Sequence, residues 1–448
     1  MIQPAEHFDA IAIGAGPFNL GFAALTDGLA DLDVAVLEAG EEFIWHPGMM
    51  LPGTHLQVPF MADLVTMADP TSKHSFLNYL KEKQRLYPFY IREDFYALRE
   101  EYSNYLAWAA ENIRSVRFGH RVLEADYRDG TYQLSVLTAA GLTRFTADKL
   151  VLGTGTQPYL PPVITPEAQA SGKVLHSSDY AFHRERILSP RAPGSSPQVT
   201  AVLGSGQSAA EVFLDLLRSL PAEDHLVWAT RSERYFPLEY TKLTLEMTSP
   251  EYIDHFHSLP MDQRDVLSAE QKGLYKGINA DLINEIHEEL YQRSVNGAPN
   301  VHLRTGCAAT SIDADPDYLA VRLHHERTGE DLEFLADNLV MATGYRASAP
   351  DFLEGISQRI DYLPDGRFNV DREYSIGLDQ DIFVQNAELH THGFTAPDLG
   401  MGAYRNSVII NRLARREVYP VEQRIAFQRF GAAELSGLPT SSNASARA

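Results

Sequence analysis

The N-terminal segment of the chain joins a short apolar run to a glycine-rich turn and a second apolar segment. Residues 8–13 are mostly apolar, which predicts a buried strand. Residues 20–29 are apolar and rich in alanine, which predicts a helix. Residues 14–16 contain the two glycines of the turn, and a further apolar strand at 34–37 ends at Glu38. This order predicts a strand–turn–helix–strand unit.

The same pattern recurs in the middle of the chain. Residues 199–206 form an apolar strand with a glycine-rich turn, residues 209–217 predict a helix, and a strand at 226–230 ends at Arg231. An acid at this place hydrogen-bonds a ribose 2′-hydroxyl, whereas an arginine accepts a 2′-phosphate. The first unit therefore favours FAD and the second NADPH, although Glu38 could simply end a strand.

The glycines explain how each unit would bind a dinucleotide. Gly14 allows the tight turn, and Gly16 lets the backbone approach a phosphate closely. The helix that follows would direct its N-terminus at the diphosphate. The third position of the first motif is Asn19 instead of glycine, so the fingerprint is imperfect.

Two more apolar strands, at 149–152 and 338–342, stop at small residues that permit close approach of a cofactor. Between residues 231 and 301 the strand patterns give way to helical spacing, for example at Leu282, Ile286 and Leu290. We therefore predict an α/β fold with two Rossmann-like dinucleotide-binding domains and an inserted helical substrate region. The predicted boundaries are an FAD domain at 1–165 and 336–435, an NADPH domain at 166–235 and 301–335, a helical insertion at 236–300, and a disordered tail at 436–448.

Composition narrows the functional classes. The net charge of −22 over 448 residues argues against a nucleic-acid partner and favours cationic ligands, unless it serves solubility alone. The single cysteine, Cys307, excludes an intrachain disulfide and fits a cytoplasmic location. We predict no metal site, no membrane span and no signal peptide, because ligand spacings, long apolar runs and a basic leader are missing.

Five motifs connect the chain to a known family. They are Gly14-x-Gly16-Pro17-x-Asn19-Leu20, Trp45-His46-Pro47-Gly48-Met49, His55-Leu56-Gln57, Gly204-x-Gly206-Gln207-Ser208-Ala209, and Ala342-Thr343-Gly344-Tyr345. With them the chain resembles the microbial N-hydroxylating flavin monooxygenases of siderophore biosynthesis, the lysine and ornithine N-monooxygenases, over nearly its whole length. Baeyer–Villiger monooxygenases carry a His/Trp signature that this chain lacks, and thioredoxin-reductase-like enzymes need a cysteine pair.

The resemblance implies a mechanism and a homo-oligomer, either a dimer or a tetramer. NADPH reduces FAD, dioxygen then forms a C4a-hydroperoxyflavin, and the neutral primary amine of the substrate attacks the distal oxygen. The resemblance also implies the cofactor contacts. FAD would be held by Gly14, Gly16, Pro17, Asn19, Leu20, Glu38, Trp45, His46, Gln57, Leu399 and Gly400, and NADPH by Gly204, Gly206, Gln207, Ser208 and Arg231. Thr343, Gly344 and Tyr345 would also contact a cofactor.

Gln57 and Arg99 match family residues near the cofactors and are the predicted catalytic residues. Alternatives stay open for several positions. Arg99 could form a surface ion pair with Glu100 or Glu101, Trp45 could be a core aromatic residue, and His392 could be merely packed.

One departure from the family pattern bears on the substrate. The lysine and ornithine enzymes have a lysine five positions after the counterpart of Gln57, and this lysine holds the α-carboxylate of the substrate. Here that position is Ala62. A buried carboxylate without its cation costs several kcal/mol, so we predict a substrate without a carboxylate, namely putrescine or cadaverine.

The predicted substrate-binding residues are Ala62, Leu245 (in place of a family asparagine), Asn279 as a polar contact and Glu246 as partner of the distal ammonium. Lys242 could instead replace the missing lysine, in which case the substrate is still lysine or ornithine. A protein of another class, an inactive flavoprotein with a binding role, is the remaining alternative. One methylene changes a pocket's preference too little to decide between the two diamines.

Overall fold

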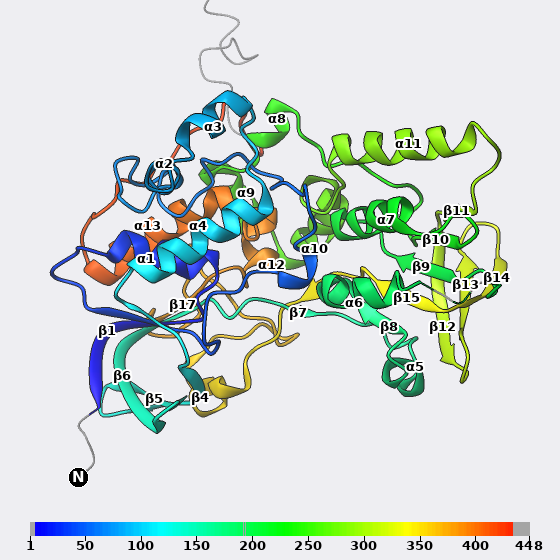
Figure 1. Ribbon diagram of the computed structural model, residues 1–448. Coiled ribbons are helices and arrows are strands. Elements are labelled where there is room, and N and C mark those ends of the chain that lie inside the picture. The colour runs from blue at the N-terminus through cyan, green and yellow to red at the C-terminus, as the bar shows by residue number, and fades with distance from the viewer. Residues whose placement is uncertain (1–4, 191, 193, 433–448) are drawn as a thin grey trace, which may run out of the picture.

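The apolar run near the N-terminus forms β1 (Glu6–Ile13), which lies inside a seven-stranded sheet. The computed structural model describes residues 5–190, 192 and 194–432, and the sheet builds the first of two lobes (Figure 1). The strand order is β3-β2-β1-β6-β5-β4, and β17 also pairs with β6. The other strands are β2 (Val34–Leu37), β3 (Val116–Arg117), β4 (Arg121–Arg128), β5 (Thr131–Thr138), β6 (Gly141–Leu152) and β17 (Ile382–Val384).

Both ends of the chain build this first lobe. Strand β17 pairs in parallel with β6, and α13 (Gly402–Ala414) packs against α1 (Pro17–Thr26). The Asn406 amide donates a hydrogen bond to the Phe18 carbonyl at 3.0 Å. One face of the sheet is covered by α1, α13 and α4 (Arg99–Asn112), with α2 (Phe76–Glu82) and α3 (Leu86–Arg92) outside them (Figure 1).

The second lobe has a five-stranded parallel sheet in the order β11-β10-β9-β15-β8. Helices α7, α6 and α11 cover one face, and a three-stranded antiparallel sheet with α5 covers the other. The elements are α5 (Pro166–Ala170), β8 (Val174–His176), α6 (Tyr180–Ile187), β9 (Val199–Leu203), α7 (Gln207–Ser219), β10 (His225–Ala229), α11 (Ala280–Ser294), β11 (Val301–Arg304), β12 (Cys307–Ala314), β13 (Leu319–His325), β14 (Glu330–Ala336) and β15 (Asn338–Met341).

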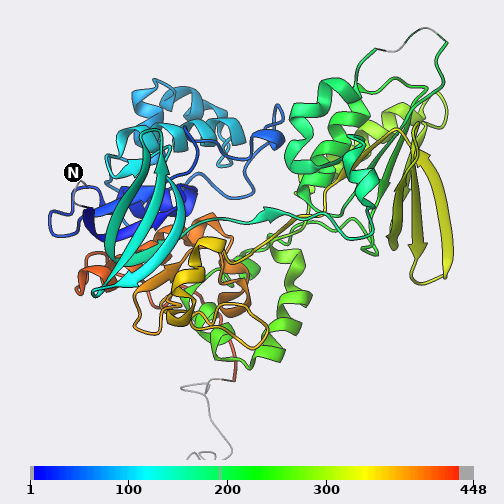
Figure 2. The ribbon, with the colours of Figure 1, turned by 90° about the horizontal axis from the view of Figure 1, so that it is seen from below.

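Two predicted boundaries need correction. Strand β15 pairs with β9 and β8, so the second lobe continues past residue 336 to Met341. The helical region 236–300 also divides between the lobes, as Figure 2 shows. Helices α9 (Pro250–Ser258) and α10 (Met261–Glu270) pack on α12 (Leu389–His392) of the first lobe. The apolar stripe of α11 packs instead on α7, because Ile286 and its neighbours complete the core of the second lobe.

The lobes are joined by a narrow ribbon of two strands. Strand β7 (Gln157–Pro158) pairs antiparallel with β16 (Tyr345–Arg346), and the chain crosses between the lobes at this point (Figure 2). The Thr343 hydroxyl donates to the Tyr159 carbonyl, and the Gly344 carbonyl lies 3.0 Å from His176 Nε2. The Thr-Gly-Tyr motif therefore shapes the crossing between the two sheets.

Residues 57–75 form an irregular segment that a buried aspartate holds in place. The Asp63 carboxylate accepts hydrogen bonds from the backbone N–H groups of Val65, Thr66 and Phe76 at 2.7–3.0 Å. Burial raises the pKa of the Asp63 carboxyl, although these hydrogen bonds oppose the shift. Ala62, the residue before it, is thus carried on a segment with a defined backbone.

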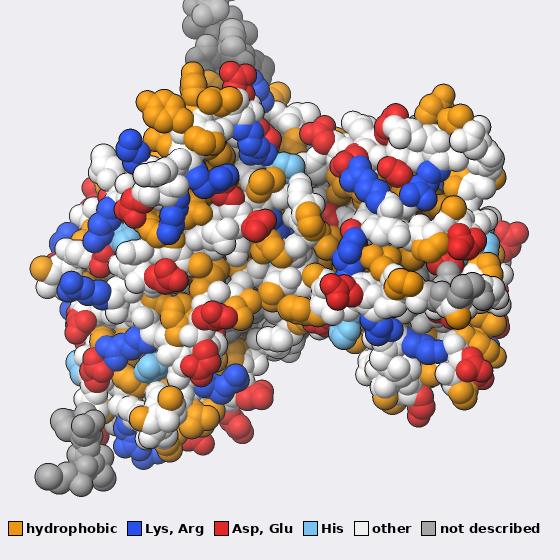
Figure 3. All heavy atoms as spheres, in the orientation of Figure 1, with side chains coloured by type: hydrophobic (Ala, Val, Ile, Leu, Met, Phe, Trp, Pro, Cys, Tyr) orange, Lys and Arg blue, Asp and Glu red, His pale blue; other side chains and the backbone are white. Residues whose placement is uncertain are grey.

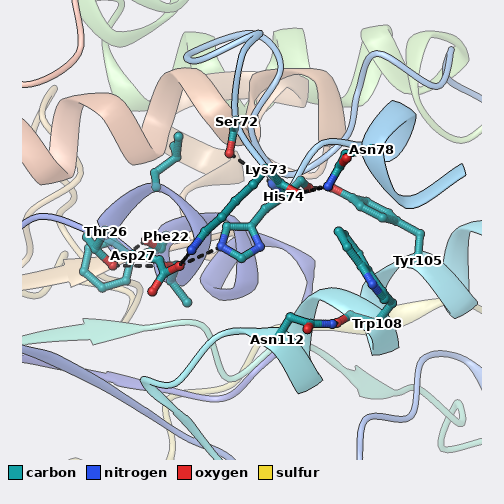
Figure 4. A network of polar contacts seen from close by, with 12 residues as sticks. Phe22, Thr26, Asp27, Ser72, Lys73, His74, Asn78, Tyr105, Trp108 and Asn112 are labelled. Carbon is teal, nitrogen blue, oxygen red and sulfur yellow. Dashed lines mark hydrogen bonds and ion pairs between the residues drawn. The ribbon is translucent and has the colours of Figure 1, made fainter. Parts of the chain in front are cut away.

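The far end of this segment is tied to α1 by charge. Figure 4 shows His74 and Lys73 meeting the carboxylate of Asp27, at the C-terminal end of α1. The distances from Asp27 Oδ2 are 2.8 Å to His74 Nε2 and 2.7 Å to Lys73 Nζ. The Tyr105 hydroxyl of α4 donates to the His74 carbonyl at 2.8 Å. The segment is therefore fixed at both ends.

Acidic and basic side chains are interspersed over the face shown in Figure 3, and hydrophobic side chains gather over α3. None of the helices in the described part of the chain is long and apolar enough to cross a membrane. The described residues contain no group of three or more His, Cys, Asp or Glu side chains that could hold a metal. The predicted tail at 436–448 lies outside the described residues.

Candidate active site

The first glycine-rich turn leaves room for a ligand at the start of α1. A Cβ on Gly14, whose φ is +91°, would lie 2.5 Å from the Gly153 carbonyl oxygen, so only glycine fits there. Gly16 precedes α1, and no side chain among the described residues caps that helix end. The Glu38 carboxylate accepts hydrogen bonds from Ala15 N–H and Gly40 N–H, both at 2.8 Å. This geometry fits a diphosphate at the helix N-terminus with an acid beside it.

Two residues assigned to this site have other roles. The Asn19 side chain is 1% exposed, and its amide donates to the carbonyls of Ile13 and Gly14 at 3.1 and 2.7 Å. Its oxygen accepts a hydrogen bond from Gln385 at 2.7 Å. Asn19 therefore locks the turn to the C-terminal part of the lobe and does not point at a phosphate. Leu20 is fully buried in the core, and Pro17 starts the helix.

The Gly204–Gly206 turn is as tightly packed as the first turn, but basic residues lie near it where the first turn has Glu38. A Cβ on Gly204 would lie 2.3 Å from the Ala342 carbonyl oxygen, and Gly206 precedes α7. The Lys276 carbonyl lies 3.3 Å from the position of a Cβ on Gly206. The pKa of Lys276 is lowered by burial and by the nearby charges of Lys272 and Arg231. Lys276 lies beside the turn, and the charges of Lys272 and Arg231 are close enough to act on it. A positive region of this kind fits a 2′-phosphate, and only Arg231 was predicted.

A chain of polar contacts crosses from one lobe to the other. Gln57 Nε2 lies 3.3 Å from Gln207 Oε1, and Gln207 Nε2 donates to Glu211 at 2.9 Å. The backbone N–H of Asn279 donates to the same Gln207 oxygen at 2.9 Å. The Asn279 side chain instead caps α11 by accepting from Asp281 N–H. Asn279 does not line the cavity described below, which corrects its prediction as a substrate contact.

Arg99 of the first lobe lies at the end of this series of polar contacts and forms an ion pair with Glu211 of the second lobe. Its guanidinium donates two hydrogen bonds to Glu211 of α7, at 2.8 and 2.6 Å, and a third to the Met49 carbonyl at 2.9 Å. The side chains of Arg99 and Glu211 are 13% and 3% exposed. The alternative of a surface pair with Glu100 or Glu101 is therefore wrong.

A cavity of about 810 Å³ lies where the lobes and the helical region meet. Its wall is mostly apolar, with methionine, leucine, tyrosine and phenylalanine side chains. Eleven of the predicted site residues line it: Trp45, His46, Gln57, Ala62, Arg99, Gln207, Ser208, Leu245, Tyr345, Leu399 and Gly400. Segments far apart in the sequence thus contribute to one site.

One end of the cavity is aromatic. The Trp45 ring lies 5.1 Å from the His46 ring and 5.7 Å from the Tyr102 ring, so it joins the core of the first lobe while it lines the cavity. His46 also meets the edge of Tyr345. Desolvation by the surrounding walls, and then the charge of Arg99, lower the pKa of His46. His46 is therefore a neutral imidazole at neutral pH.

The charged residues that line the cavity are not the ones that the sequence predicted. Glu246 does not line the cavity, because its carboxylate accepts hydrogen bonds from the backbone and side chain of Gln428, at 3.0 and 3.1 Å. Lys242 is exposed and is not part of the wall either. Among the described residues that line the cavity, Arg99 is the only lysine or arginine, and it is already paired. The acids in the wall are Glu239, Asp398 and Glu422, none of which was predicted.

His392 is fully buried. Its ring stacks on Tyr374 at 4.5 Å, and its nitrogens contact the Thr391 hydroxyl and the Arg372 carbonyl. Burial holds the pKa of His392 well below its usual value. It is a packed core histidine.

Residues 6–347 match the family model for L-lysine 6-monooxygenase/L-ornithine 5-monooxygenase. Putrescine N-hydroxylase of Shewanella oneidensis is 45% identical over 94% of this chain and 84% of its own length.

Two solved structures are similar throughout. The FAD-bound cadaverine monooxygenase DfoA of Erwinia amylovora has a TM-score of 0.91 and 46% identity, covering 95% of this chain and 99% of its own. The ornithine N-hydroxylase KtzI of Kutzneria sp. 744, with reduced FAD, NADP⁺ and L-ornithine, has a TM-score of 0.82 and 27% identity, covering 91% and 99%. The protein therefore belongs to the L-lysine 6-monooxygenase/L-ornithine 5-monooxygenase family.

Proposed function

We propose that the protein is an FAD- and NADPH-dependent monooxygenase that hydroxylates one nitrogen of putrescine or cadaverine for hydroxamate siderophore biosynthesis. The observation that carries the proposal is the cavity wall at Ala62, which is buried and offers no free cation among the described residues. A substrate α-carboxylate would lie there without a partner. The relatives named for putrescine and cadaverine support the same substrate class.

The two turns support the cofactor assignment. Gly14, Gly16 and Glu38 would hold the diphosphate and ribose of FAD, and Gly204, Gly206 and Arg231 those of NADPH. When bound and reduced by NADPH, FAD activates dioxygen for transfer to an amine nitrogen. The chain itself supplies an apolar cavity that limits water and a polar bridge from Gln57 to Glu211 that sets the two lobes against each other.

The experiment is a substrate panel with the purified, FAD-loaded protein. We expect kcat/KM for putrescine or cadaverine to exceed that for L-lysine and L-ornithine by about 100-fold or more, measured as hydroxylamine product and NADPH-dependent oxygen uptake. Higher kcat/KM for either amino acid would refute the diamine assignment. A protein that takes up FAD and consumes no oxygen with any amine would favour the inactive flavoprotein.

The compartment and assembly are further parts of the proposal. A cytoplasmic location is supported by the single, buried cysteine. A homo-oligomer, dimer or tetramer, is supported by exposed apolar side chains on α3, namely Tyr87, Tyr90 and Ile91. Light scattering during gel filtration tests the assembly, and a monomer at micromolar concentration would exclude it.

A further inference from the structure

One corner of the cavity brings together three residues from two distant segments. A Cβ on Gly400 would lie 3.1 Å from Asp398 Oδ1 and 3.9 Å from the Cβ of Ala62. Asp398 and Ala62 therefore border the same small space beside Gly400, and all three residues line the cavity. The residue that departs from the lysine and ornithine enzymes thus has a carboxylate as its neighbour.

Asp398 is held in a fixed orientation at this corner. Its Oδ1 accepts a hydrogen bond from Gly400 N–H at 2.7 Å, and the nearby Thr248 hydroxyl favours the ionised form of the carboxyl. Burial raises the pKa of the Asp398 carboxyl, and these two groups together with the charge of Arg405 oppose the shift. A carboxylate in such surroundings gains from a cation placed next to it.

The surroundings single out Asp398 among the acids of the cavity. Glu239 and Glu422 are exposed, whereas Asp398 is partly buried and its carboxyl is desolvated by the surrounding protein. Tyr240 lines the same cavity as Asp398, and the charge of Asp398 contributes, after burial and the nearby Tyr96, to the raised pKa of Tyr240.

Arg99 is the only lysine or arginine among the described residues that line the cavity. Arg99 is paired with Glu211, so it is not free to neutralise Asp398. Arg405, whose charge reaches Asp398, is fully buried and is paired with Glu388. The corner thus combines a negative group with apolar walls, which is complementary to an ammonium on an aliphatic chain.

We propose that Asp398 binds the distal ammonium of the diamine, with Ala62 leaving the space that this ammonium occupies. This inference rests on the proposed function and assigns the substrate contact that Glu246 does not make. The amine to be hydroxylated then lies at the far end of a four- or five-carbon chain, toward Trp45, His46 and Gln57. The resemblance places a lysine at the position of Ala62 in the amino-acid hydroxylases, and such a lysine would add a positive charge at this corner.

The main test is D398N in the FAD- and NADP⁺-loaded enzyme. An asparagine oxygen can still accept the Gly400 N–H, so the variant removes the charge and keeps the local turn. We expect KM and the calorimetric Kd for cadaverine to rise by about 10- to 100-fold. We expect kcat/KM for n-pentylamine, which lacks the second ammonium, to change by less than about threefold.

Two further variants make the test specific. D365N is the matched control. Like Asp398, the exposed Asp365 accepts a hydrogen bond from the backbone N–H two residues later (Arg367, 3.0 Å), but it does not line the cavity. We therefore expect D365N to leave KM for cadaverine unchanged. A62K places a tethered ammonium beside Asp398, and we expect it to weaken cadaverine binding as D398N does while n-pentylamine is still oxidised.

The outcomes separate the two proposals. If the wild-type enzyme hydroxylates cadaverine and D398N binds it within about twofold of wild type, the Asp398 assignment is overturned and the proposed function stands. If the wild-type enzyme hydroxylates neither diamine, both the proposed function and the Asp398 assignment are refuted. If D398N does not retain FAD, A62K decides, and an unchanged KM for cadaverine in A62K would overturn the assignment.

Discussion

Replacement of Arg99 by methionine should loosen the contact between the two lobes. The R99M variant leaves the Glu211 carboxylate, whose side chain is 3% exposed, with only the Gln207 amide among its described hydrogen-bond partners. Removal of one partner from a buried ion pair costs about 3–5 kcal/mol. The 13% exposure of Arg99 and the remaining Gln207 contact place this case near the lower limit, at about 3 kcal/mol.

Differential scanning calorimetry at saturating FAD, without NADPH, measures this effect. A loss of about 3 kcal/mol should lower Tm by about 3 °C, because the entropy of unfolding is about 2.1 cal/mol/K per residue over 448 residues. The double variant R99M/E211M removes the buried charge as well as its partner, and we expect it to melt above R99M. If R99M melts within about 1 °C of wild type, or if the double variant is less stable than R99M, the ion pair does not hold the lobes as argued.

Three other predictions follow from the described contacts. G14A should lose FAD during purification, because its Cβ would clash with the Gly153 carbonyl; the ratio of 450 nm to 280 nm absorbance reports retained flavin, and an unchanged ratio would contradict the clash. K276M should raise KM for NADPH more than KM for NADH, since Lys276 lies in the positive region assigned to the 2′-phosphate. The lowered pKa of His392 means that the folded state keeps it neutral while the unfolded chain takes up a proton below about pH 6.5. Tm should therefore be highest above about pH 6.5 and fall as the pH is lowered further, and H392Q should show a shallower fall.

Local sequence signals predicted the two strand–turn–helix–strand units to which the cofactors are assigned. A glycine turn between an apolar strand and an apolar helix needs only neighbouring residues to form, and both predicted units appear at β1–α1–β2 and β9–α7–β10. The acid and the arginine that follow β2 and β10 also lie where the strand ends predict them. The departure at Ala62 was visible because its position is fixed by its spacing of five residues from Gln57.

Side chains whose direction depends on distant partners were not predictable. Glu246 was expected in the cavity, but its carboxylate is bound by Gln428, far along the chain. Asn279 and Asn19 are polar residues beside motifs, and the fold uses them to cap a helix and lock a turn. Asp398 directly precedes Leu399 and Gly400, which were predicted as cofactor contacts, yet only the proximity of Gly400 to Ala62 and the shared cavity wall bring its carboxylate to attention.

The first lobe has a consequence for synthesis on the ribosome. Its sheet needs β17 beside β6, and its helical layer needs α13 against α1, so translation must pass residue 414 before these contacts can form. The second lobe has all its strands once residue 341 has left the exit tunnel. We therefore expect the second lobe to fold before the first lobe during synthesis. FAD should then bind late, after the chain has been released from the ribosome.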